Sequence, residues 1–205
     1  MSSLFSDTYN EIEREAEASI REKGSKFLAY SFKVNSETEV KQKIQTLKAH
    51  YPDATHHCYA YIIGEGQEAQ RANDDGEPVN SAGRPILRAL LSADLTNILV
   101  VVVRYFGGTM LGIPGLIQAY GDSAKGVLLL SGKMQKIQED IFEIFANFEH
   151  EQQIHQLLKP YDHRVIEREY LEQVRYRVSV RRNQALQFLS KAQEAYQLLV
   201  KSIRN

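Results

Sequence analysis

The sequence has one cysteine, no tryptophan and only five prolines among its 205 residues. Because a lone cysteine cannot form an internal disulfide, Cys58 excludes a disulfide framework and a cysteine-rich zinc site, and it favours a reducing compartment. No run reaches the roughly 18 consecutive apolar residues that a membrane-spanning helix needs. The N-terminus also lacks a basic segment followed by an apolar one, which marks a secretory signal. We therefore expect a cytoplasmic protein with no membrane partner.

An excess of charge of either sign is also missing. The 25 lysines and arginines balance 26 acidic residues, which gives a formal net charge of −1 and a pI near 6.6. This balance argues against a generic polyanion binder, so a nucleic-acid contact requires a local basic patch. Apolar residues make up 43% of the chain and suffice for an ordinary core. The length fits one large domain or two small ones.

Helix and strand patterns predict an α/β domain over residues 1–135. Ser36 and Glu39 form a capping box, and the apolar residues that follow recur at helical spacing until Pro52. Ile98 to Val103 is a continuous apolar run, typical of a strand covered on both faces. The other predicted elements are strands at 18–22, 26–34 and 56–63, a long loop at 64–83, and helices from Pro85 to about Asp94 and from Pro114 to Gly132.

The pattern changes over residues 136–205, where glycine is absent. Strands are predicted at 140–148, 163–170 and 173–180, and helices at 149–159 and 183–200. This βαββα order predicts a small ferredoxin-like domain. The whole chain is therefore expected to have an α+β fold of two domains.

The last predicted strand of this domain carries a candidate secondary basic face. Its members, Arg175, Arg177 and Arg181, lie on one side of the strand and are candidates for nucleic-acid contact. Glu167 and Glu169 on the preceding strand offer the alternative of a salt-bridged, solvated sheet face.

Two glycine-containing blocks, Asn73–Pro78 and Arg104–Gly112, form the main candidate site. They flank the apolar strand, at positions where loops carry binding and catalysis. Glycines permit close approach of a partner, arginines bind phosphate or carboxylate, and aromatic rings can stack on a base. The helix that begins near Pro114 also presents free N–H groups that favour an anion. The candidate residues are Asp74, Asp75, Glu77, Arg84, Arg88, Arg104, Tyr105, Phe106, Gly107, Gly108 and Gly112.

Other interpretations of the same residues remain open. The acids of the first block can pair with Arg84, Arg88 and Arg104 and merely tie the two loops together, with Phe106 as a core residue. A metal is disfavoured because the acids lack the spacing of a calcium loop, and because His56 and His57 point to opposite faces of a strand. Cys58 lies mid-strand, where a small buried hydrophobe is commoner than a nucleophile. We predict neither a metal nor a cofactor.

Several segments in order resemble the YigZ/IMPACT family. They are Ala54–Tyr61, Asp74–Pro78, Ala82–Leu87, Val102–Gly108, Leu111–Gly112, Gly115–Leu116 and Ala119–Tyr120. The resemblance implies a first domain similar to domain IV of elongation factor G and a second similar to its domain V. It also implies a role in regulating translation. Eukaryotic members bind a translation-stress regulator, and bacterial members are connected with nucleic acid or the ribosome.

The chain departs from the family pattern at two places. Asn80 and Ser81 replace a usual Gly-Thr pair, and they remain small and able to form hydrogen bonds. Ile113–Pro114 and Gln118 replace a glycine-rich step and an arginine, which weakens the expected phosphate contact.

Three functional hypotheses follow. The first is a non-enzymatic, translation-linked regulator that binds RNA, the ribosome or a translation-associated protein through the two loops. The second is a small hydrolase or ligand-binding enzyme that uses Asp74, Asp75 and Glu77. The third is a module that binds only another protein.

Overall fold

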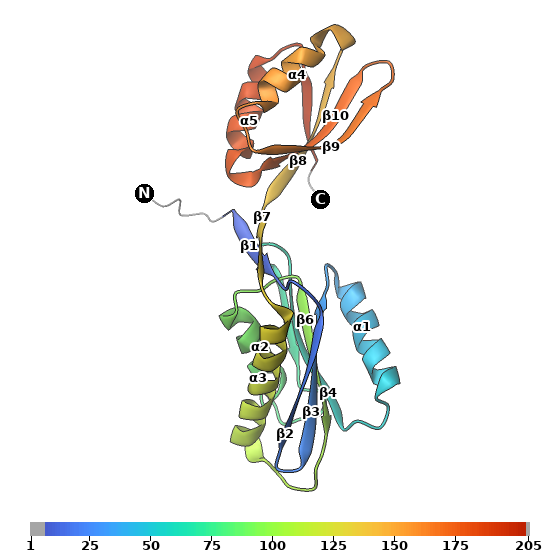
Figure 1. The fold of residues 1–205 in the computed structure, drawn as a ribbon, viewed down its shortest axis with the longest axis vertical. Helices are drawn as coiled ribbons and strands as arrows, with labels where there is room; N and C mark the ends of the chain where they lie inside the picture. The colour runs from blue at the N-terminus through green and yellow to red at the C-terminus, as the bar shows by residue number, and fades with distance from the viewer. Residues whose placement is uncertain (1–6, 204–205) are drawn as a thin grey trace, which may run out of the picture. The chain divides into compact units, whose positions relative to one another are not determined.

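The computed structural model describes residues 7–203 and shows two compact units. The first unit comprises residues 9–136, and the second comprises residues 137–203 together with residues 7 and 8. Figure 1 shows both as layered arrangements of helices and strands. The mixed α+β class expected from the sequence is therefore confirmed. No helix formed by residues 7–203 is long and apolar enough to cross a membrane.

The first unit is built on a five-stranded antiparallel sheet with helices on both faces (Figure 1). The strands, in spatial order, are β2 (Ala16–Glu22), β3 (Ser25–Lys33), β6 (Ile98–Tyr105), β4 (His56–Ile63) and β5 (Ala69–Asn73). Helices α2 (Gly83–Ser92) and α3 (Gly112–Ser131) cover one face, and α1 (Glu37–His50) covers the other.

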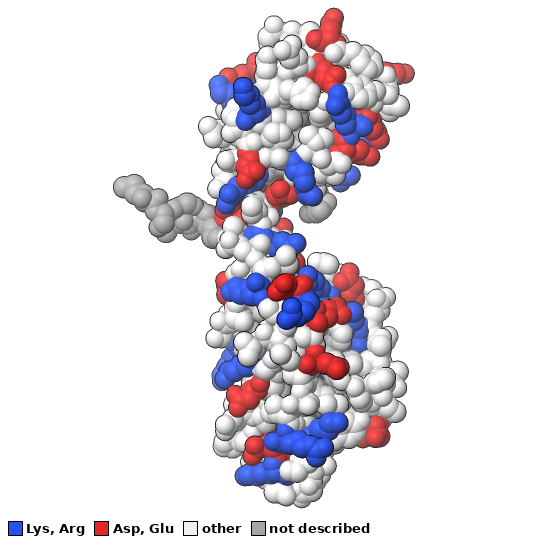
Figure 2. All heavy atoms as spheres, in the orientation of Figure 1, with Lys and Arg blue, Asp and Glu red and all other residues white. Residues whose placement is uncertain are grey.

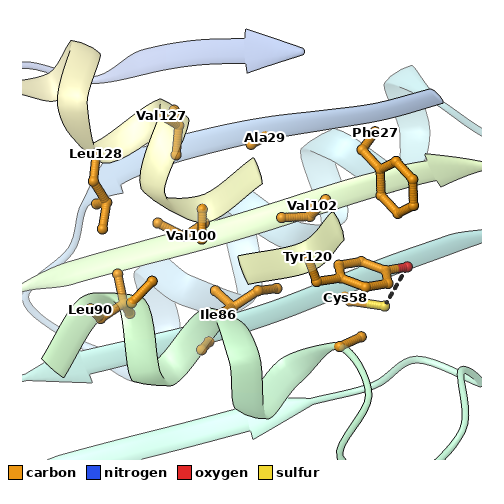
Figure 3. Packing of buried hydrophobic residues seen from close by; sticks show 14 of the residues in the cluster. Phe27, Ala29, Cys58, Ile86, Leu90, Val100, Val102, Tyr120, Val127 and Leu128 are labelled. Atoms are coloured by element: carbon orange, nitrogen blue, oxygen red, sulfur yellow. Dashed lines mark hydrogen bonds between the residues drawn. The ribbon is translucent and has the colours of Figure 1, made fainter. Parts of the chain in front are cut away.

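The central strand β6 explains why the sheet is covered twice. Its residues from Ile98 to Arg104 are all buried. Val100 and Val102 pack into the cluster under α2 and α3, whereas Leu99 and Val101 pack into the cluster under α1. Figure 3 shows Val100 and Val102 on β6 among other residues of the cluster under α2 and α3, with Ala29 on the neighbouring strand β3. The predicted two-sided strand is thus confirmed.

The capping box at the start of α1 is also confirmed in part. The Glu39 N–H donates to Ser36 Oγ at 3.3 Å, as expected for an N-cap serine. The Glu39 carboxylate, however, accepts from the N–H of Asn35 at 2.9 Å, one residue before the N-cap.

Two expectations for the first unit were wrong. The predicted loop at 64–83 contains the edge strand β5, which pairs with β4. Its sequence, AQRAN, is polar and half exposed, so it lacks the apolar alternation that marks a strand. Helix α3 begins at Gly112, before Pro114. In addition, β1 (Thr8–Glu11) and β7 (Met134–Ile137) form a separate two-stranded sheet that was not predicted.

The second unit has a four-stranded antiparallel sheet in the order β11-β8-β10-β9. The strands are β8 (Glu139–Ala146), β9 (His163–Tyr170), β10 (Val174–Arg181) and β11 (Leu199–Ile203). The helical elements are the 3₁₀ turn η1 (Phe148–His150), α4 (Glu151–Leu158) and α5 (Arg182–Glu194). Its core includes Phe142, Ile144, Tyr176, Val178 and Phe188.

The element order of this unit corrects the predicted βαββα pattern to β-α-β-β-α-β. Helix α5 ends at Glu194, so a helix reaching Val200 was a wrong prediction. Leu199 and Val200 continued the helical spacing, but they belong to β11, and Val200 lies opposite Ile144 of β8. The backbone N–H groups and carbonyls of this segment are satisfied by the sheet instead of by a helix.

Candidate partner-binding site

The loop after β5 is fixed by the carboxylate of Asp74. Asp74 Oδ1 accepts hydrogen bonds from the N–H groups of Ala82 and Gly83 at 3.0 and 2.8 Å. Its Oδ2 accepts from the N–H of Asn80 at 2.8 Å. The N-cap residue of α2, Ala82, has no side-chain acceptor, so Asp74 supplies the missing acceptors and a negative charge at the helix N-terminus. The side chain therefore faces its own chain.

Asp75 is held by strand β4 and helix α1. Its Oδ2 accepts from the His57 N–H at 2.7 Å, and its Oδ1 accepts from Lys48 Nζ at 2.9 Å. Burial raises the pKa of the Asp75 carboxyl, but the His57 N–H and the Lys48 ammonium outweigh it and leave the pKa below its ordinary value. The Asp75 carbonyl also bonds to His56 Nδ1 at 2.8 Å. Asp75 is therefore ionised and engaged in the fold.

Glu77 and Arg104 form a buried ion pair. Arg104 Nη1 donates to Glu77 Oε1 at 2.5 Å, and the two side chains are 6% and 3% exposed, respectively. The register explains the pairing, because Arg104 lies opposite His56 at the end of β4, beside the loop that carries Glu77. Of the pairings considered from the sequence, only this one is formed. This ion pair thus connects the two glycine-containing blocks.

The ion pair continues into a chain of buried polar side chains. Tyr120 Oη donates to Glu77 Oε1 at 2.8 Å, and Cys58 Sγ lies 3.3 Å from Tyr120 Oη. Figure 3 shows the Tyr120 hydroxyl pointing to the sulfur of Cys58. Burial raises the pKa of Cys58 and of Tyr120 far above their ordinary values. We call Cys58, Glu77, Arg104 and Tyr120 the buried network.

Gly107 approaches its own chain and not a partner. A Cβ at this position would lie 1.9 Å from the carbonyl carbon of Gly24, so only glycine fits. Ser25 Oγ accepts from the Gly107 N–H at 3.2 Å and lies 3.3 Å from Arg104 Nη2. The loop after β6 is thereby fastened to the β2–β3 turn. Gly108, by contrast, has a φ of +85° and open space where a Cβ would be.

Apolar side chains in the loop after β6 and at the start of α3 face solvent. Phe106 is 49% exposed, Met110 84% and Ile113 53%. The Arg104 guanidinium lies 5.6 Å from the centroid of the Phe106 ring and supports it from below. Phe106 is therefore not a core residue, contrary to one interpretation of the sequence. Gly112, with a φ of +72°, makes the turn into α3 between Met110 and Ile113.

Among the remaining predicted residues, Tyr105 has a side-chain hydrogen bond, whereas Arg84 and Arg88 have none within residues 7–203. The Tyr105 hydroxyl donates to Asp53 at 3.0 Å. Burial and, to a smaller extent, this hydrogen bond raise the pKa of Tyr105. Arg84 and Arg88 are exposed on α2, and neither makes a hydrogen bond or ion pair with any residue in the described range 7–203. Sequence reasoning missed the exposed apolar side chains of Val79, Met110, Ile113 and Ile117. An available signal was the position of Met110 and Ile113 beside glycines at a helix start.

Two arginines of the secondary basic face, Arg175 and Arg181, form ion pairs with neighbouring acids. Arg175 lies 2.9, 3.4 and 3.8 Å from Glu167, Glu169 and Glu143. The salt-bridged alternative is thus confirmed for Arg175.

Arg181 and Arg177 complete this face. Arg181 Nε donates to Asp7 at 2.5 Å, and this hydrogen bond lowers the pKa of Asp7. Arg177 lies in register between Glu143 and Glu167. Figure 2 shows basic and acidic side chains interspersed over the visible surface of both units, without a large patch of one sign.

The acidic and thiol side chains of the two blocks and of β4 are engaged within the first unit. Within residues 7–203, no three His, Cys, Asp or Glu side chains are grouped to hold a metal ion. The three acids of the first block accept hydrogen bonds from the protein itself. The buried Cys58 thiol, with its raised pKa, is poorly suited to nucleophilic attack.

Residues 23–128 match the family model of the Impact N-terminal domain, which covers more than half of the chain. The chain belongs to the IMPACT family. YvyE of Bacillus subtilis is 48% identical over 99 residues, which are 48% of this chain and 46% of YvyE. The chain therefore spans less than half the length of that relative. YigZ of Escherichia coli is 30% identical over 171 residues, 82% of this chain and 84% of YigZ.

A solved structure shares the fold over nearly the whole chain. The crystal structure of a hypothetical protein covers 98% of this chain and 100% of its own, with 27% identity and a TM-score of 0.70.

Proposed function

We propose that this IMPACT family protein is a non-enzymatic regulator linked to translation. In this proposal it contacts a component of the translation apparatus through the surface around the two glycine-containing blocks. The resemblance analysed from the sequence implies such a role for the family, and membership of the family supports extending it to this chain. The proposal places the protein in the cytoplasm, where translation takes place.

One observation carries the proposal. Asp74, Asp75, Glu77 and Arg104 are engaged inside the fold, whereas Phe106 and its apolar neighbours are exposed above them. A reaction site requires titratable groups that are free to act on a substrate. A contact surface requires fixed, exposed side chains instead. The arrangement therefore favours binding over the hydrolase alternative.

The predicted site residues acquire two roles in this proposal. Arg84, Arg88, Phe106, Gly108 and Gly112 form the contact surface itself. The inward-facing residues hold this surface from beneath; they are Asp74, Asp75, Glu77, Arg104, Tyr105 and Gly107. The surface belongs to the predicted first domain, residues 1–135, and the second, residues 136–205, is a separate module. Similarity of the two to domains IV and V of elongation factor G remains part of the proposal and suits a ribosomal partner.

Cosedimentation tests the proposal. The purified protein is mixed with ribosomes, ribosomal subunits or free RNA from its own host across a salt series. We expect binding to at least one of these fractions, and we expect Phe106→Ser and the pair Arg84→Gln/Arg88→Gln to weaken it about ten-fold or more. Arg14→Gln, an exposed arginine outside the surface, is the matched control. Arg104 is unsuitable for this test because it is buried.

The salt series separates the partner classes. Loss of two phosphate contacts on a single strand should reduce the slope of log K against log salt by about 1.4. An unchanged slope with weaker binding indicates a protein surface. Absence of binding to every fraction at low salt, or equal binding by all variants, would contradict the proposal.

A further inference from the structure

The buried stripe of helix α3 continues beyond the elements that cover it. Tyr120, Ala124 and Val127 recur at helical spacing and are completely buried. Ile117 and Ile113 continue the same inward stripe for two turns toward the N-terminus of α3, yet they are 37% and 53% exposed. An apolar stripe on an amphipathic helix normally packs against another element. These two turns therefore present an apolar face that residues 7–203 cover only in part.

Helix α2 packs against only part of the apolar stripe of α3. It has 10 residues against 20 in α3, and the helices meet where Pro85 Cβ lies 4.0 Å from a Cβ built on Gly121. Ile117 precedes Gly121 by one turn, and Ile113 precedes it by two. Because α2 begins at Gly83, it has only two residues before Pro85 to cover them. The side chains of Phe106 and Met110, in the loop that leads into α3, are exposed as well.

The charged side chains exposed on α2 are positive, and they form no ion pair within residues 7–203. Arg84 and Arg88 lie one turn apart on the exposed side of α2, beside the helix contact at Pro85. Within the described part of the chain, neither guanidinium has an ion-pair or hydrogen-bond partner. The acids of the nearby loop pair with neither guanidinium, because Glu77 bonds to Arg104, Asp75 bonds to Lys48, and Asp74 bonds to backbone N–H groups at the start of α2.

We propose that this surface binds an acidic amphipathic segment of a partner protein. The segment would continue the cover that α2 provides, with apolar side chains against Phe106, Met110, Ile113 and Ile117 and carboxylates at the arginines of α2. This inference rests on the proposed function for one point, that the surface is a contact surface. The docking surface is defined as Arg84, Arg88, Phe106, Met110, Ile113 and Ile117.

Charge decides against the other occupants. A nucleic acid requires several cations along its backbone, and this surface offers two arginines among exposed apolar side chains. A second copy in a two-fold contact would bring the same basic surface against itself. An acidic segment instead removes apolar area from water and pairs both guanidinium groups, which bind carboxylates with a planar fork.

Selection from a phage-displayed library of random 16-residue peptides tests the inference on the full chain. We expect enriched peptides to carry apolar residues at i, i+3 or i+4 and an excess of Asp and Glu. Binding of a synthetic enriched peptide, measured by fluorescence anisotropy, should weaken about ten-fold or more in Ile113→Gln/Ile117→Gln and in Arg84→Gln/Arg88→Gln. Leu129→Gln is the matched control, since Leu129 is 83% exposed near the other end of α3.

Each other outcome overturns the inference. These are no enrichment, enrichment without acidic residues, and equal affinity for all variants that retain the wild-type amide NMR spectrum. Displacement of the peptide by micromolar single-stranded RNA would assign the surface to nucleic acid. A concentration-dependent dimer that Ile113→Gln/Ile117→Gln abolishes would assign it to a second copy. Because this test contains no ribosomal component, peptide binding without ribosome association refutes the proposed function alone.

Discussion

Replacing Arg104 by methionine should destabilise the first unit strongly. The substitution keeps most of the side-chain volume but removes the positive charge that faces Glu77 at 2.5 Å. The Glu77 side chain is 3% exposed, so water cannot replace the lost partner without opening the loop. Removal of one member of a buried ion pair typically costs about 3–5 kcal/mol. That is a large part of the roughly 5–15 kcal/mol by which domains are stable.

A double-mutant cycle tests the cause of this loss. In Arg104→Met/Glu77→Leu no buried charge remains, so the loss should be smaller than the sum of the two single losses by at least about 2 kcal/mol. Part of the loss should persist, because the Tyr120 hydroxyl donates to Glu77 and then lacks its acceptor, at a cost of about 1–3 kcal/mol. Adding Tyr120→Phe should therefore recover some of the remaining loss.

Native-state hydrogen exchange is the suitable assay for this cycle. The chain has two compact units and no tryptophan, so one optical unfolding curve would mix two transitions. Exchange of the Val100 and Val102 amides, in the central strand, reports the opening free energy of the first unit alone. A loss below about 1 kcal/mol in Arg104→Met, or simple additivity in the cycle, would refute the view that the pair acts as a buried, mutually dependent unit.

Three shorter predictions follow from neighbouring residues. Gly107→Ala should lower the free energy of unfolding by about 1–3 kcal/mol, because its Cβ would clash with the backbone of Gly24. This loss should exceed that of Gly108→Ala, whose Cβ meets open space and bears only the strain of positive φ. Equal melting temperatures of the two variants would contradict the backbone contact. Burial lowers the pKa of His57 despite the opposing charge of Asp75, so the unfolded chain takes up a proton near pH 6.5 before the folded one does. Stability should consequently fall as pH decreases from about 7 toward the folded pKa, with a slope of at most about 1.4 kcal/mol per pH unit from this group, and His57→Gln in a urea series at pH 5–8 should flatten that slope. Cys58 is fully buried with a raised pKa, so Ellman's reagent at pH 8 should react about 100-fold or more slowly with the folded protein than in urea, and rapid native reaction would show that the network opens.

The sequence predicts elements best where a signal is local. The apolar run of β6 and the capping box before α1 depend on adjacent residues, and both are present. Strand β5 was missed because an edge strand needs little apolar alternation when only one neighbour pairs with it. Strand β11 was missed because its apolar residues also fit the preceding helical stripe, and only its pairing with β8 decides between them.

The candidate site shows the same limit at the level of side chains. The sequence shows acids and arginines in neighbouring segments, but it does not determine which arginine pairs with Glu77. Strand register decides this, because it sets Arg104 opposite His56 beside the Glu77 loop and leaves Arg84 and Arg88 on the surface of α2. The apolar part of the surface was missed because single apolar residues are commonly exposed on folded proteins. They indicate a binding site only when they lie together in the structure, which the sequence does not show.

The buried and the exposed residues of the two loops depend on each other. Apolar side chains such as Phe106 gain nothing from exposure, and a free loop would fold them inward. The ion pair beneath, the guanidinium of Arg104 under the Phe106 ring and the backbone contact of Gly107 with Gly24 hold the loop in place. A fixed loop loses less conformational entropy when a partner binds. Substitutions in the buried network should therefore lower stability and binding together, whereas Ile113→Gln/Ile117→Gln should lower binding alone.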